Sequence, residues 1–288
     1  MRSITETGRF ALRTLCISAF VFAASGAAHS EQADAGKKAP AKAPAAAAVT
    51  ESQTQARAIL MRMAEFLAGT QSFSVTVRGG YDAVQKSGQK IEFGESRKVT
   101  LSRPDRLRVE VEGSDGTKTL AAFNGKEIVL IDAIRNVYAT APQLAGVDDT
   151  VVHFVRDLGI RLPLALLLVS RLPAELEDRV RSIDYVEKTG ILGAASHHLA
   201  ARTATVDFQV WVADGDKPLP LRIVLTYKQA PGQPQYWAQF SDWNLAPAIA
   251  DSTFSVQPPD GAQKVVFAAE LARRSPAVRK QSADKGAK

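Results

Sequence analysis

Short segments in which apolar and polar residues alternate constrain the fold of this 288-residue chain more than any other feature. Residues 106–112 read Arg-Leu-Arg-Val-Glu-Val-Glu, and residues 72–78 alternate in the same way. Because successive side chains of a strand point to opposite faces, each segment predicts a strand with one buried and one solvated face. Turn-forming pairs such as Asp115-Gly116 and Asn124-Gly125 separate such segments at short intervals. The spacing favours an antiparallel meander over a parallel sheet with crossover helices.

Helical patterns open and interrupt this meander. Apolar residues recur at helical spacing over 59–67, and Gly69 is the expected end of that helix. A second helix should begin at Asp148 and Asp149 and end at Gly159, and a charged helical stretch is expected over 175–181. The order is a helix, about six strands, a helical insert and about five more strands. This order predicts an α+β domain in which helices pack onto one large curved antiparallel sheet.

The N-terminus is typical of a secretory signal peptide over residues 1–30. Three arginines precede a short apolar run at 15–24, and small residues lead to a cleavage site ending at Ser30. The apolar run is too short to span a bilayer. We therefore expect a periplasmic protein whose mature chain lacks cysteine, because Cys16 is removed with the signal.

The charge is concentrated at the ends of the chain. Residues 271–288 hold six basic residues and one acidic residue, whereas the predicted domain at 51–270 holds 24 basic and 26 acidic residues. The Ala/Lys/Pro-rich segment 31–50 is predicted to be a disordered linker, and 271–288 a disordered basic tail. Alternatively, these tails touch an anionic membrane surface. Because the domain has no basic cluster, we expect no nucleic-acid partner.

The three tryptophans are out of phase with the apolar rows of their strands. Val210 and Val212 define one face of their strand, and Trp211 falls on the other. Phe240 belongs to the apolar row of a later strand, while Trp237 and Trp243 fall on the opposite side. If the strands are in simple register, the tryptophans share a largely polar face, which is typical of a cavity or a partner surface. The alternative is ordinary packing beneath the N-terminal helix.

The run Leu162–Val169 contains eight consecutive apolar residues or prolines. Such a segment is either buried on all sides, as a short core helix, or it shields an apolar hole as a plug or lid. Phe154, in the preceding helix, is expected to contribute to the same shielding. The run is too short to span a membrane.

No pattern indicates catalysis, a metal or a cofactor. The chain lacks a Gly-rich phosphate loop and a Gly-x-Ser-x-Gly elbow. His197 and His198 are adjacent on a predicted strand, so their side chains point to opposite faces and do not readily chelate one ion. We expect a protein that is not an enzyme, with no catalytic residue, metal ligand or cofactor.

Several short motifs, in order and spacing, carry a resemblance to a bacterial family, domain of unknown function 2092. They are Phe123-Asn124-Gly125-Lys126, Asn136-Val137-Tyr138-Ala139, Leu162-Pro163-Leu164, His198-Leu199-Ala200, Asp207-Phe208-Gln209-Val210-Trp211-Val212, Pro218-Leu219-Pro220, Phe254 and Pro258-Pro259-Asp260-Gly261-Ala262. The resemblance covers roughly residues 52–268. That family is similar in architecture to the LolA/LolB-like lipoprotein carriers. It implies a half-open β-barrel, of about 11 strands by our count, whose concave face is lined by apolar residues and covered by helices.

Two functional hypotheses follow. The first is a monomeric periplasmic carrier or binding protein for a lipid, an acyl chain or a lipoprotein. The second is a protein-interaction or sensor module that binds envelope proteins and no small molecule. Under the first hypothesis, the residues that shield, line or rim the cleft are Phe154, Leu164, Leu166, Leu167, Leu168, Val169, Trp211, Trp237 and Trp243.

Overall fold

The computed structural model describes residues 50–158 and 162–267. The predicted signal peptide, the linker apart from Thr50, and the basic tail lie outside these residues. Gly159, the predicted end of a helix, lies outside them as well. The fold described below therefore concerns the domain predicted at 51–270.

The domain opens with α1 (Glu51–Gly69), which confirms the predicted first helix and its end. Thr50 and Gln53 form a capping box, in which the Thr50 hydroxyl accepts from the Gln53 amide at 3.2 Å and the Gln53 side chain accepts from the Thr50 amide at 3.1 Å. One face of the helix is buried against the sheet. Its buried residues are Ala56, Ile59, Leu60, Met63, Ala64 and Leu67.

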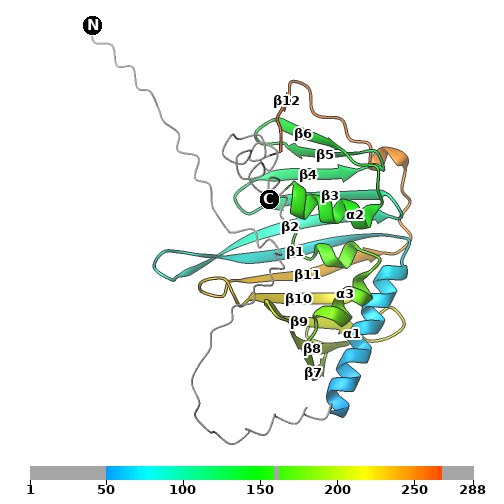
Figure 1. The fold of residues 1–288 in the computed structure, drawn as a ribbon, viewed down its shortest axis with the longest axis vertical. Helices are drawn as coiled ribbons and strands as arrows, with labels where there is room; N and C mark the ends of the chain where they lie inside the picture. Colours follow the sequence, from blue (N-terminus) through cyan, green and yellow to red (C-terminus); the bar gives the residue numbers. More distant parts are fainter. Residues whose placement is uncertain (1–49, 159–161, 268–288) are drawn as a thin grey trace, which may run out of the picture. The chain divides into compact units, whose positions relative to one another are not determined.

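Twelve strands form one curved antiparallel sheet that is not closed, which confirms the predicted sheet and adds one strand to the expected count (Figure 1). The first six are β1 (Ser72–Val84), β2 (Lys90–Ser102), β3 (Arg106–Gly113), β4 (Lys118–Phe123), β5 (Glu127–Asp132) and β6 (Val137–Pro142). The others are β7 (Ser182–Thr189), β8 (Ser196–Arg202), β9 (Val206–Ala213), β10 (Pro220–Tyr227), β11 (Gln235–Asn244) and β12 (Gln263–Lys264).

The strand order β12-β6-β5-β4-β3-β2-β1-β11-β10-β9-β8-β7 shows two meanders joined side by side. β1 to β6 form the first meander, β7 to β11 form the second, and β1 pairs antiparallel with β11. The additional strand is β12, which pairs parallel with β6 over two residues. A strand of two residues is too short to show the alternation of apolar and polar residues from which strands are predicted.

The turn between β4 and β5 differs in detail from the prediction. Gly125 has a φ of +85°, as expected for this pair, but Asn124 does not adopt a positive φ. Instead, the Asn124 side-chain oxygen accepts hydrogen bonds from the backbone amides of Lys126 and Glu127, both at 3.0 Å. These side-chain hydrogen bonds take the place of a backbone hydrogen bond in the turn, and the loop is longer than the two-residue loop of a tight hairpin.

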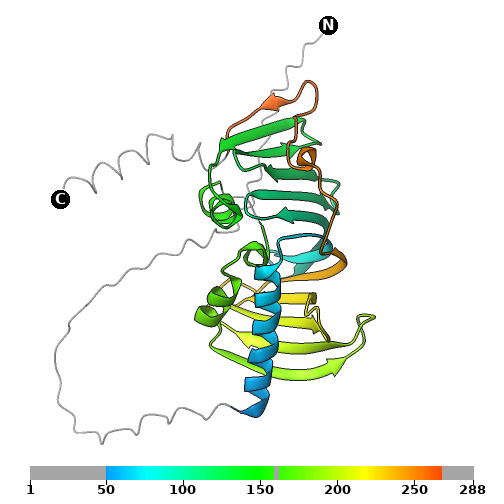
Figure 2. The same cartoon turned by 90° about the vertical axis from the view of Figure 1, so that its right-hand side faces the viewer.

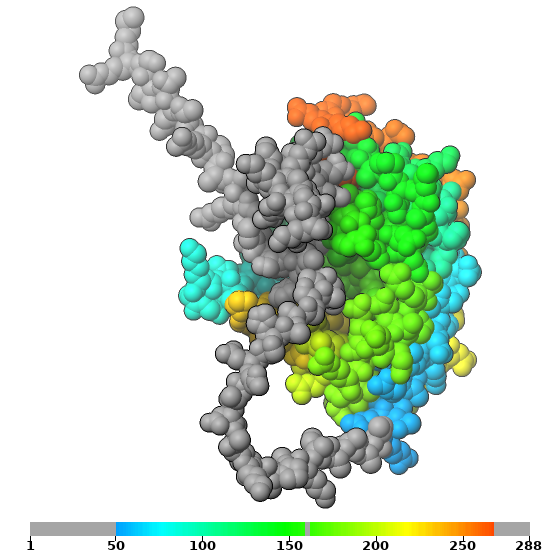
Figure 3. Space-filling model, in the orientation of Figure 1, coloured from blue at the N-terminus to red at the C-terminus, as the bar shows by residue number. Residues whose placement is uncertain are grey.

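The insert between the two meanders is helical, as predicted. It comprises α2 (Val147–Val152), the π-helical turn η1 (His153–Asp157), the 3₁₀ turn η2 (Ala165–Leu168) and α3 (Leu172–Arg179). The predicted cap is wrong, because α2 begins after Gly146, and Asp148 and Asp149 lie in its first turn. The insert and α1 lie on the same side of the sheet (Figure 2), and in the space-filling view they form a layer in front of it (Figure 3).

The two faces of the sheet are therefore covered differently. We call the side beneath α1 and the insert the helix-covered face, and the other side the outer face. On the outer face, residues 245–262 run past β3 to β5, where Arg108 donates to the carbonyl of Thr253 at 3.0 Å (Figure 2). Phe254 in this segment is buried. A separate 3₁₀ turn, η3 (Asp251–Thr253), lies in the same segment.

The packing of α1 leads to a stability prediction. Leu67 has no exposed surface, so Leu67→Ala should leave a cavity and lower the free energy of unfolding by about 2–5 kcal/mol. Leu144 is 86% exposed, and Leu144→Ala should change stability by no more than about 0.5 kcal/mol. Urea unfolding followed by circular dichroism measures both. Equal losses in the two variants would contradict the proposed core.

Candidate functional site

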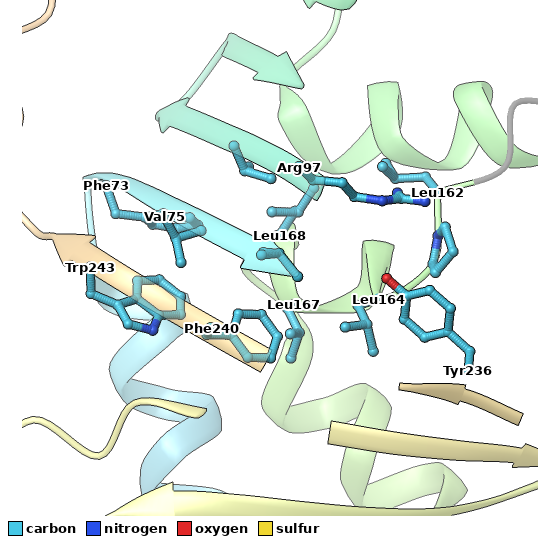
Figure 4. Close-up of a pocket in the computed structure, with 13 residues that line it drawn as sticks. Phe73, Val75, Arg97, Leu162, Leu164, Leu167, Leu168, Tyr236, Phe240 and Trp243 are labelled. Atoms are coloured by element: carbon cyan, nitrogen blue, oxygen red, sulfur yellow. The ribbon is translucent and has the colours of Figure 1, made fainter. Parts of the chain in front are cut away.

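A small pocket lies on the helix-covered face, between the sheet and the insert (Figure 4). Its volume is about 40 Å³. That space accommodates a water molecule but not a drug-sized ligand, which needs roughly 300–1,000 Å³. The lining residues are Phe73, Val75, Val77, Arg97, Val99, Leu162, Pro163, Leu164, Leu167, Leu168, Tyr236, Phe240 and Trp243.

Residues 162–169, which we call the covering segment, close the pocket on the insert side. Leu162 to Leu167 are half-buried, whereas Leu168 and Val169 are buried. Leu164 has a φ of +62°, a left-handed conformation that costs a leucine about 1–2 kcal/mol. The segment is thus held in a strained backbone conformation over an apolar pocket.

Asp148 fixes the end of the covering segment. Its carboxylate accepts hydrogen bonds from the Ser170 amide at 2.9 Å and from the Ser170 hydroxyl at 2.6 Å. Arg103, in the turn between β2 and β3, lies 3.5 Å from the same carboxylate. Desolvation by burial lowers the pKa of Arg103, and Asp148 opposes that shift. The sequence pattern suggested a helix cap for Asp148, whereas the structure uses it to tie the insert to the sheet.

A buried polar group forms one end of the pocket. The Arg97 guanidinium donates to the two carboxylate oxygens of Glu95 from Nε and Nη2, at 2.8 Å each. The Tyr236 hydroxyl donates to Glu95 Oε1 at 3.0 Å. Burial raises the pKa of the Tyr236 phenol above its ordinary value, so this hydroxyl stays protonated. Arg97 Nη1 is buried and has no hydrogen-bond partner among the described residues.

Gly79 makes room for this polar group. It lies between Glu95 on β2 and Ala238 on β11, in register with both. A Cβ atom at this position would lie 2.7 Å from the Trp237 carbonyl oxygen and 3.1 Å from the Tyr236 hydroxyl. Tyr236 reaches Glu95 because the intervening strand carries no side chain here.

Sequence reasoning did not single out Arg97, Glu95 or Tyr236 as site residues. A signal was nevertheless present, because Glu95 and Arg97 occupy the same alternate positions on β2 as the apolar Phe93, Val99 and Leu101. Charged residues on an apolar face are seldom buried unless they are paired. The pattern therefore contained an ion pair within the core.

The structure brings together several of the predicted site residues. Leu164, Leu167, Leu168 and Trp243 line the pocket. Leu166 is half-buried and packs against the core without lining the pocket. Val169 and Phe154 are core residues, each 2% exposed. The covering segment thus lies where a plug or lid was expected, with most of its leucines toward the sheet.

The prediction that the three tryptophans share a face is wrong. The register of β11 against β1 shifts between Ser241 and Asn244, and Asp242 has a φ of +54°. This β-bulge adds one residue and turns Trp243 to the helix-covered face. There its ring lies 5.3 Å from Phe73 and 5.9 Å from Phe240. The alternation of apolar residues along the sequence does not reveal such an inserted residue.

Trp211 and Trp237 lie on the outer face and do not line this pocket. The Arg222 guanidinium lies between them, 5.8 Å from the Trp211 ring centre and 5.1 Å from that of Trp237. His198 stacks on Trp211 at 4.0 Å with an interplanar angle of 10°. Cation–π contacts and stacking therefore account for these rings through intramolecular packing.

His197 and His198 on β8 are held in hydrogen bonds within the sheet. His197 contacts the Tyr185 hydroxyl and Asp214, each at 3.1 Å, while His198 contacts Gln209 at 3.0 Å. Within residues 50–158 and 162–267, no group of three or more His, Cys, Asp or Glu side chains is placed to hold a metal ion. In the same ranges, no helix combines the length and the apolar character needed to cross a membrane.

The protein belongs to the α+β class: helices cover one face of an open antiparallel sheet and close a small apolar pocket there. The model of the family described as "Predicted periplasmic protein (DUF2092)" matches residues 56–268, and the chain belongs to this family. The description confirms the family resemblance and the periplasmic localisation expected from the sequence. No curated protein matches the chain.

Three of the solved structures that match this chain come from different bacteria. The match to a conserved protein from Thermus thermophilus covers 74% of this chain and 99% of that protein, with 14% identity and a TM-score of 0.43. LprF from Mycobacterium bovis is 15% identical, with a TM-score of 0.43 and coverages of 73% and 98%. The LolA superfamily protein NE2245 from Nitrosomonas europaea is 14% identical, with a TM-score of 0.37 and coverages of 69% and 96%.

The role of Gly79 can be tested by adding one methyl group. Gly79→Ala should lower the free energy of unfolding by about 1–3 kcal/mol, because its Cβ would collide with the backbone of β11. Gly190→Ala adds the same group where nothing lies within 4 Å and should stay within about 0.5 kcal/mol of the parent. Urea unfolding compares the two. A neutral Gly79→Ala would show that Tyr236 and Glu95 do not need this space.

Proposed function

We propose that the protein is a periplasmic binding or carrier protein for an acyl chain, carried by a lipid or a lipidated protein. The observation that supports this most directly is the covered apolar pocket. Of the thirteen described residues that line it, eleven are apolar aliphatic or aromatic residues, and Arg97 and Tyr236 are the exceptions. In this proposal an acyl chain enters between the sheet and the covering segment and displaces the leucines of that segment.

The energetics of displacement set a minimum chain length. Exposing two leucines, such as Leu164 and Leu167, costs about 3–6 kcal/mol. Each buried methylene contributes about 0.8 kcal/mol, so roughly four to eight methylenes are needed to offset that cost. Relief of the strained conformation at Leu164 lowers the cost further. Affinity should therefore rise with chain length, and hexadecanoyl compounds should bind more tightly than hexanoyl compounds.

Leu167→Asp tests the proposed pocket. A carboxylate among the apolar lining residues is unfavourable to a hydrocarbon chain, so affinity for a fluorescent hexadecanoyl ester should fall at least about tenfold. Leu144→Asp, at a position 86% exposed, is the matched control and should bind as the parent does. Fluorescence titration gives the affinities, and circular dichroism checks the fold. Unchanged binding by a folded Leu167→Asp variant would reject this site.

Native mass spectrometry of protein purified gently from the periplasm provides an independent test. A long-chain acyl ligand should accompany the parent protein and should be depleted in Leu167→Asp. Lipid extraction then identifies the chain. An equal amount of ligand on both proteins would place the acyl chain elsewhere.

A second candidate function is a protein-interaction module of the cell envelope. The small volume of the pocket favours it, because a filled core needs no ligand. The outer face of β1, β10 and β11 offers Arg78, Gln239 and Arg222 side by side in register. A photo-crosslinking residue at the exposed Gln239 should then capture a protein, whereas the same residue at the pocket-lining Leu167 should capture lipid if the carrier proposal holds.

A further inference from the structure

Arg97 presents to the pocket a hydrogen-bond donor, Nη1, that has no partner among the described residues. Nε and Nη2 are both occupied by Glu95, whereas Nη1 is buried without a partner among the described residues. Buried donors in native proteins are almost always hydrogen-bonded. The Tyr236 hydroxyl gives its proton to Glu95 and has none left for a ligand. Arg97 Nη1 is therefore the donor available to a bound molecule.

The charges at the pocket restrict the chemical class of the molecule that can bind there. The side chains of Arg97 and Glu95 are 8% and 10% exposed, and they neutralise each other through two hydrogen bonds. Among the described residues that line the pocket, Arg97 is the one that carries a charge. A ligand carboxylate would bring a further negative charge with no cation to compensate it, which is costly in a buried site. An uncharged oxygen can accept from Nη1 without that cost.

The layout of the pocket is suited to a molecule with one polar end. The Arg97 side chain extends toward Leu162 at the beginning of the covering segment, while Phe73 and Trp243 lie at the opposite end (Figure 4). A polar group at Arg97 would thus continue into a hydrocarbon chain lying along Phe240 and beneath Leu167. The present volume suffices for the polar group, and the chain takes the place of the covering leucines.

We infer that the pocket selects acyl chains bearing an uncharged carbonyl, an ester or an amide, and that Glu95 makes it discriminate against free fatty acids. The ligand carbonyl oxygen accepts hydrogen bonds from Arg97 Nη1. This inference rests on the proposed function and adds the chemical class of the ligand to it. Discrimination comes from the Glu95 carboxylate, which removes the net charge that would otherwise attract an anion.

Competition binding tests the inference on the full mature chain. A bound fluorescent hexadecanoyl ester is displaced with hexadecanoylglycerol, hexadecanamide or hexadecanoate at pH 8, where the fatty acid is ionised. The ester and the amide should each compete at least about tenfold better than the acid. Their relative strength distinguishes an ester-linked from an amide-linked source of the chain.

Two substitutions make the test specific to the ion pair. Glu95→Gln keeps the shape but leaves Arg97 uncompensated, so hexadecanoate should become the better competitor. Arg97→Lys keeps a cation beside Glu95 but removes the spare Nη1 donors, so the preference for ester over acid should fall while chain binding persists. Arg108 and Glu110 form a matched pair on the outer face, at 2.8 Å and with the same spacing. Glu110→Gln and Arg108→Lys should leave the preference unchanged.

The outcomes separate this inference from the proposed function. If the parent binds hexadecanoate as well as the ester, the inference is wrong and the carrier proposal stands. The inference also fails if Glu95→Gln folds and keeps the preference of the parent. If neither ligand binds, both fail. Should Glu95→Gln not fold, the parent and Arg97→Lys decide the matter.

Discussion

The antiparallel pairing of β1 with β11 holds the two meanders in one sheet. β1 is the first strand of one meander and β11 the last strand of the other, so their pairing joins residues that are far apart in the chain. Val77 then lies beside Phe240, and Gly79 beside Ala238. The pocket lies across this joint, with Phe73 and Arg97 from the first meander and Tyr236 and Trp243 from the second. Neither meander alone supplies a complete site.

The joint also explains how an ion pair comes to lie in the core. On β2, Arg97 donates hydrogen bonds to both carboxylate oxygens of Glu95. Tyr236, on β11, donates a further hydrogen bond to the same carboxylate. Removing one member of a buried pair leaves an uncompensated charge, so the three side chains depend on one another. Such a group specifies the register of β1 against β11, because a slip would separate Tyr236 from Glu95. The proposed binding site and the strand register thus depend on the same residues.

The two faces of the sheet divide the roles of the aromatic residues. On the outer face, Trp211 and Trp237 pack around Arg222 and need no ligand. On the helix-covered face, Trp243 and Phe240 lie beneath leucines that are only half-buried. A segment that is apolar, strained and incompletely buried is better suited to displacement than a fully packed helix. This contrast supports a binding role for the helix-covered face.

Local patterns in the sequence predict the first helix, about six strands, a helical insert and about five further strands, because helical and strand periodicities are local properties. It also located the covering segment, since eight apolar residues in a row are visible without a fold. No local pattern shows that β1 pairs with β11, that a bulge at Asp242 turns Trp243 inward, or that Tyr236 donates a hydrogen bond to Glu95 of the Arg97–Glu95 pair. These features depend on contacts between distant strands, and an added residue in one strand reverses the side on which each later side chain lies.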